Sequence, residues 1–273
     1  LTPGLTQVWI LRLNADGDTL WTRMYRAHHY NYARRICELP HGGFVVGLTS
    51  YSDLITQPGT MNIITYDSAG TPQWGKTYRD SLDIALNDLI VTDDGHFFLI
   101  GKTIGGDRAN VVYADGQTGE IVWQKRFSGW WNIAKVYETA AHDFLWLGQI
   151  QQSDGTPVSA MMRFSGAGDS LECHTFSGLQ LFDGVPLNNQ QFVAVGQDKS
   201  ASGINLFSID QSGKATTINA LQYGDQSLSN HKIVAADNGL VTVSVTDQAA
   251  TATERCLCVS DLLLVQWSLK AIR

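Results

Sequence analysis

The chain has few charged residues, no lysine- or arginine-rich run and no long apolar stretch. Charged residues make up 16% of the 273 residues, and the formal net charge is −7. Binding to nucleic acid or to an anionic membrane surface through charge requires a basic patch. No apolar run is longer than that of residues 262–265, and such a run is far shorter than the roughly 20 residues that span a bilayer. We therefore expect no nucleic-acid partner and no membrane insertion.

Cysteine is also scarce, with four residues in the chain. They are too few and too scattered for a disulfide framework, and Cys256 and Cys258 would point to the same face of a strand. We expect free, buried thiols, no metal site and no cofactor, because a zinc site needs a second paired cluster. The sequence opens at Leu1 without the segments of an export signal, so we expect any such signal to have been removed or to lie outside it.

What the sequence does contain is a repeat of about fifty residues, a period typical of propellers and solenoids. A turn glycine is followed four residues later by a large side chain. The pairs are Gly17 with Trp21, Gly70 with Trp74, Gly119 with Trp123 and, in weaker form, Gly168 with Glu172 and Gly213 with Thr217. The spacings between these glycines are 53, 49, 49 and 45 residues, and a sixth copy near the end keeps only Trp267.

Two kinds of β-hairpin alternate within the repeat. Outer hairpins surround the turn glycines, which supply a positive φ angle; they cover residues 9–25, 62–78, 110–127, 160–176, 205–221 and 256–272. Inner hairpins lie between them and end in nearly continuous apolar strands, which need cover on both faces. We expect these inner strands to end at Gly47, Gly101, Gly148, Gly196 and Ser244.

Four strands in each repeat predict an all-β protein, a β-propeller of four-stranded antiparallel blades forming a single domain over residues 1–273. Little helix is expected. Six outer hairpins and five inner ones predict six blades with the first incomplete, so that residue 1 falls inside a blade; the alternative is five blades with a spare hairpin. Trp21, Trp74, Trp123 and Trp267 should occupy equivalent positions, largely buried against a neighbouring blade.

The repeat resembles that of secreted bacterial β-propellers with "DGGYVVAG" and "DxxGxxxWxxxYGG" motifs. The matching residues are 40–47 (PHGGFVVG), 93–101 (DDGHFFLIG) and 14–25 (NADGDTLWTRMY). The resemblance covers nearly the whole chain and implies a periplasmic, cell-surface or secreted location. Residues 118–123 (TGEIVW) also match a motif of quinone-dependent propeller enzymes, but its tryptophan has a packing role that propellers without a cofactor share.

Candidate binding residues lie in the connectors that lead from outer to inner hairpins, because rigid blades place such loops around one mouth of the ring. The connectors carry aromatic rings, carboxylates and imidazoles, which suit a protein or glycan partner. The candidate residues are His28, His29, Tyr30, Asp83, Trp130, Trp131, Phe182 and Asp225. Trp130 should reach solvent while Trp131 packs inward. Adjacent His28 and His29 would diverge in an extended segment and share a metal poorly. His41, His96 and His142 occupy or flank inner-hairpin turns. Their repetition at equivalent places indicates a role in forming the turns and not a shared cluster.

These features favour a non-catalytic recognition or scaffold propeller of an exported bacterial protein. The alternative is an enzyme, either a glycan-active hydrolase or lyase or a quinone-dependent dehydrogenase. Asp80, Asp83, Asp183 and Asp225 could supply a carboxylate pair for glycoside chemistry, although acidic connector residues more often hold their loop by accepting backbone N–H groups. Nucleophile-elbow, phosphate-loop and zinc-protease motifs do not occur in the sequence.

Overall fold

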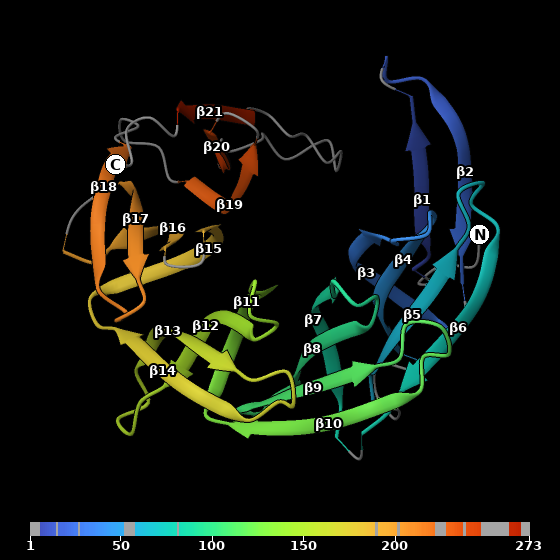
Figure 1. The fold of residues 1–273 in the computed structure, drawn as a ribbon, viewed down its shortest axis with the longest axis horizontal. Coiled ribbons are helices and arrows are strands. Elements are labelled where there is room, and N and C mark those ends of the chain that lie inside the picture. Colours follow the sequence, from blue (N-terminus) through green and yellow to red (C-terminus); the bar gives the residue numbers. More distant parts are fainter. Residues whose placement is uncertain are drawn as a thin grey trace, which may run out of the picture. The chain divides into compact units, whose positions relative to one another are not determined.

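The protein consists of β-strands joined by turns (Figure 1). The computed structural model describes residues 6–14, 16–26, 28–51, 58–80, 82–188, 191–200, 203–221, 228–236, 239–246 and 262–268, and no helix occurs among them. The all-β prediction is confirmed for these residues, in which no helix could cross a membrane. The chain divides into two compact units, Leu1–Glu138 and Thr139–Arg273, which we describe in turn.

The first unit contains a two-stranded sheet, a four-stranded sheet and a second four-stranded sheet, followed by the strand β11. The strands are β1 (Val8–Leu13), β2 (Thr19–Tyr25), β3 (Tyr30–Glu38), β4 (Phe44–Tyr51), β5 (Thr60–Tyr66), β6 (Pro72–Tyr78), β7 (Ile84–Val91), β8 (Phe97–Thr103), β9 (Arg108–Ala114), β10 (Ile121–Ser128) and β11 (Trp130–Glu138). Strand order in each sheet follows the chain, β1-β2, β3-β4-β5-β6 and β7-β8-β9-β10. All strand pairs within these three sheets are antiparallel, as the hairpin repeat predicts.

The second unit repeats this pattern. Its strands are β12 (Phe144–Gln151), β13 (Pro157–Phe164), β14 (Ser170–Phe176), β15 (Leu179–Asn188), β16 (Gln191–Asp198), β17 (Ile204–Asp210), β18 (Ala215–Leu221), β19 (Leu228–Ala236), β20 (Gly239–Thr246) and β21 (Leu262–Ser268). The sheet orders are β11-β12-β13-β14, β15-β16-β17-β18 and β19-β20-β21. Most of the sixth outer hairpin predicted over residues 256–272 lies outside the described residues.

Turn glycines form the outer hairpins as predicted. Gly17, Gly70, Gly119, Gly168 and Gly213 all have φ between +69° and +90°, a region that side chains disfavour. The predicted ends of the inner strands are wrong, because β4, β8, β12, β16 and β20 all continue past the glycine or serine. These glycines permit close packing instead: a Cβ on Gly101 would lie 2.6 Å from Sδ of Met61.

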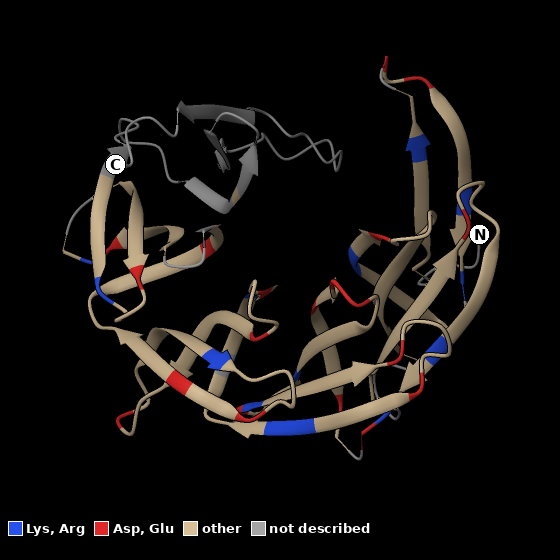
Figure 2. Ribbon diagram, in the orientation of Figure 1, with Lys and Arg blue, Asp and Glu red and all other residues tan. Residues whose placement is uncertain are grey.

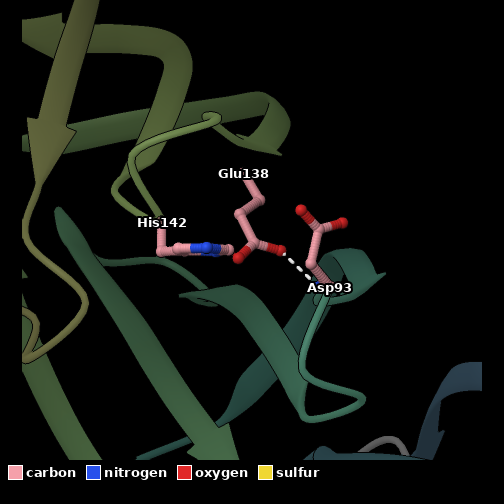
Figure 3. Close-up of side chains that lie close together, drawn as sticks. All are labelled: Asp93, Glu138 and His142. Atoms are coloured by element: carbon pink, nitrogen blue, oxygen red, sulfur yellow. Dashed lines mark hydrogen bonds between the residues drawn. The ribbon is translucent and has the colours of Figure 1, made fainter.

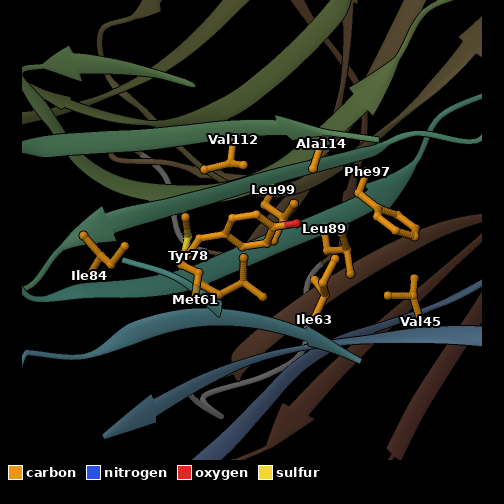
Figure 4. Close-up of a cluster of buried hydrophobic side chains, with 11 residues drawn as sticks. Val45, Met61, Ile63, Tyr78, Ile84, Leu89, Phe97, Leu99, Val112 and Ala114 are labelled. Atoms are coloured by element: carbon orange, nitrogen blue, oxygen red, sulfur yellow. The ribbon is translucent and has the colours of Figure 1, made fainter. Parts of the chain in front are cut away.

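The main core of the first unit lies between the β3–β6 and β7–β10 sheets (Figure 4). Its side chains are at most 2% exposed: Val45, Met61, Ile63, Tyr78, Ile84, Leu86, Leu89, Phe97, Leu99, Val112 and Ala114. A second core lies between β1 and the β3–β6 sheet, where Val8 and Ile10 pack with Ile64 and Tyr66. Burial of each large aliphatic side chain stabilises the fold by about 1.5–3 kcal/mol. Successive sheets of this unit are therefore joined face to face.

Tryptophans of the outermost strands contact the turn of the next sheet. A Cβ on Gly70 would lie 2.8 Å from the Trp21 ring, and one on Gly119 would lie 2.7 Å from the Trp74 ring. The predicted docking of these two rings is confirmed, although both remain half-buried. Trp267 does not share the position, because its strand β21 pairs directly with β20, opposite Leu240. β6, which carries Trp74, is separated from β4 by β5.

A buried aspartate joins successive innermost strands in each unit. Asp88 of β7 accepts the backbone N–H of Leu89 and, at 3.0 Å, that of Val136 in β11. Asp183 of β15 accepts the N–H of Gly184 and, at 3.2 Å, that of Ile233 in β19. Both carboxylates lie at a register shift in their strand and are at most 2% exposed. We call this contact the aspartate link.

Candidate functional site

The connectors of the first unit lead into the innermost strands β3, β7 and β11. In the His28–His29 segment the backbone is fixed by its neighbours. Asn31 Nδ2 donates to the carbonyl oxygens of His28 (2.8 Å) and Thr6 (3.1 Å), and the N–H of Thr6 donates to the carbonyl of His29 (3.1 Å). Buried Asn31 thus presents His29 as an exposed side chain, with His28 and Tyr30 half-buried.

Asp83 lies in the next connector and holds it to the neighbouring strand. Its carboxylate accepts the backbone N–H of Gly59, and its carbonyl accepts the N–H of Ile104 at 2.8 Å. Leu82 and Ile104, on either side of this contact, are 36% and 41% exposed. Apolar side chains therefore flank a fixed carboxylate at this end of the β7–β10 sheet.

Two tyrosines complete the group that we call the Tyr–Asp cluster, formed by Tyr32, Tyr51 and Asp83. Tyr51 pairs with Tyr30 across β3 and β4, and its ring meets the Tyr32 ring edge-on, with centroids 6.1 Å apart. Burial, followed by the negative charge of Asp83, raises the pKa of Tyr51 to about 12. The phenol is therefore neutral near pH 7, while Tyr32 is 37% exposed.

The predicted exposure of Trp130 is wrong, because this side chain is only 3% exposed. The connector before it is a short turn at Gly129, which has φ +83°, so that β11 begins at Trp130. Its backbone N–H donates to the carbonyl of Asp107 at 2.8 Å. Trp130 is therefore part of the core. The side chain of Trp131 and all of Asp225 lie outside the described residues, and Phe182 is half-buried in β15 of the second unit.

Two of the carboxylates considered for glycoside chemistry have structural partners. The Asp80 side chain is fully buried and makes a two-pronged contact with Arg126, at 2.7 and 2.8 Å. Asp183 forms the aspartate link of the second unit and is not a connector residue. Of the four carboxylates, only Asp83 is a described residue that belongs to the Tyr–Asp cluster.

As predicted, His41, His96 and His142 lie in or beside the turns of inner hairpins. His142 has φ +58°, the one positive value among the described non-glycine residues. His96 stacks on Tyr113, with centroids 5.1 Å apart. Figure 3 shows the turn region near His142, where the Glu138 carboxylate accepts the backbone N–H of Asp93 at 2.7 Å.

Sequence reasoning missed Tyr51, Asp88 and the connector role of Leu82 and Ile104. Tyr51 is the last residue of an apolar strand. In the sequence, an aromatic residue at this place indicates the end of a strand as readily as it indicates a binding site. Asp88 interrupts an apolar run, residues 84–91, and Asp183 does the same 95 residues later. That recurrence is a signal that could have identified the aspartate link. In Figure 2 the acidic residues lie mainly in turns and at strand ends, whereas Asp88 and Asp183 are buried residues within strands.

No protein-family model and no curated protein matches the chain. Solved structures match it at low sequence identity. A protein of unknown function from Bacteroides caccae has a TM-score of 0.56 and 10% identity, over 88% of this chain and 80% of that one. Synechocystis apocarotenoid oxygenase has 0.53 and 10%, over 86% and 62%. The Dos1 propeller has 0.50 and 11%, over 86% and 58%.

The chain thus spans less than two thirds of the oxygenase and of the Dos1 propeller. At 10% to 11% identity these matches bear on the fold alone. Together with the four-stranded antiparallel sheets, they show an all-β fold that is similar to known propellers.

Proposed function

We propose that the protein is a non-catalytic recognition propeller of an exported bacterial protein and that its Tyr–Asp cluster binds a protein partner. The fold resemblance supports the propeller, and the repeat supports six blades with the first incomplete. The motifs shared with secreted bacterial propellers support a periplasmic, cell-surface or secreted location. The observation that carries the binding role is the joint exposure of Tyr32, Leu82 and Ile104 beside the fixed Asp83 carboxylate.

The chemistry of this surface favours a protein over a glycan. Exposed Leu82 and Ile104 are aliphatic, whereas a sugar-binding surface combines a flat aromatic face with several free polar groups. Tyrosine is enriched among residues that dominate binding energy at protein interfaces. Tyr51 supplies a neutral phenol and Asp83 a charge, which can fix the orientation of the partner. A segment with apolar side chains and one cationic or N–H donor group matches these features.

The bonding of the connector carboxylates weighs against the enzymatic alternative. A glycosidase needs two carboxylates free to act as acid and as base or nucleophile. Asp80 is paired with Arg126, and Asp183 is buried in the aspartate link. Asp83 is already an acceptor for Gly59.

The experiment is affinity capture from an extract of the bacterium that encodes the protein, with partners identified by mass spectrometry and their affinity then measured. Tyr32→Ala should weaken binding about tenfold to thirtyfold, as expected for an interface tyrosine. Thermal denaturation checks that the variant is folded at the assay temperature, since it loses the ring contact with Tyr51. Val122→Ala is the control: Val122 is 55% exposed in β10 and is not part of the cluster, so affinity should not change.

Three results would contradict the proposal. One is a captured protein whose affinity is the same for Tyr32→Ala and wild type. Another is binding to immobilised polysaccharide that Tyr32→Ala abolishes, which would make the ligand a glycan. The third is turnover of a glycan by the purified protein that is lost in Asp83→Asn.

A further inference from the structure

We draw no further inference here: the strongest candidate, the exposed apolar patch of Trp9, Leu11, Leu13 and Met24 on β1 and β2, carries none, because nothing in the structure shows what covers it.

Discussion

Removal of the Asp88 carboxylate is expected to destabilise the first unit by about 3–5 kcal/mol, because it leaves two backbone N–H donors and a partly exposed guanidinium without their acceptor. In Asp88→Ala the N–H groups of Leu89 and Val136 lose their acceptor, and each buried unsatisfied donor costs about 1–3 kcal/mol. Arg35 also loses its partner, because its Nε lies 3.4 Å from the Asp88 carboxylate. Burial raises the pKa of Asp88, so relief of that desolvation keeps the total below the sum of these costs.

Asp88→Asn keeps a carbonyl oxygen for one donor but removes the charge, and should cost about 2 kcal/mol because one donor remains unpaired. Urea denaturation gives the change in unfolding free energy. Hydrogen exchange at the Val136 amide reports the aspartate link directly, which matters because two units can unfold separately. Asp154→Ala, in an exposed turn, is the control and should change Val136 exchange little. The reasoning fails if Asp88→Ala costs less than about 1 kcal/mol, or if Val136 exchange rises no more than that of Val112.

Three further predictions follow from the described contacts. Trp74→Ala should cost about 2–3 kcal/mol of unfolding free energy, below the range for a fully buried tryptophan. Gly119→Ala should be less destabilising in the Trp74→Ala background than in wild type, because its Cβ would meet the Trp74 ring at 2.7 Å. A double-mutant cycle by urea denaturation measures this coupling. Ultraviolet titration of Tyr51→Phe should lack one phenol with a midpoint near pH 12. Since the pKa of Tyr51 is raised in the folded state, its contribution to stability is present below pH 10 and is lost as the pH rises toward 12. Loss of a phenol that titrates near pH 10 would contradict this. Glu120→Gln should change the unfolding free energy by less than about 0.5 kcal/mol, because its pair with Lys76 is exposed; a loss above about 1 kcal/mol in thermal denaturation would refute that.

The hairpins could be predicted from sequence because their determinants are local. An Asp-Gly or Ala-Gly turn with alternating flanks specifies a hairpin whatever lies around it, and the five turn glycines have the expected φ angles. The ends of the inner strands could not be predicted in the same way, because in the sequence a glycine within an apolar run resembles the end of a strand. In Gly101 it serves contact with Met61, a residue about forty positions earlier.

The candidate site was harder to predict, since it depends on where a strand begins and on contacts distant in the chain. Trp130 was interpreted as a connector residue, but the Gly129 turn ends the connector one residue earlier and places the ring in the core. Asp183 was assigned to a connector although its strand starts at Leu179. Asp83 was selected correctly as a connector carboxylate, whereas its neighbour Tyr51 depends on a pairing with β3 that spacing does not reveal.

The order of strands within the sheets bears on how the chain is made. Every strand in the described part of the chain pairs with a neighbour in sequence, so a sheet can form as soon as about fifty residues have left the ribosome, without waiting for a distant partner. The contacts of Trp21 with Gly70 and of Trp74 with Gly119, and the aspartate links from β7 to β11 and from β15 to β19, then fasten these elements to one another. Folding during synthesis would proceed as an elongation, in which the newest sheet always exposes one unsatisfied face until its successor arrives.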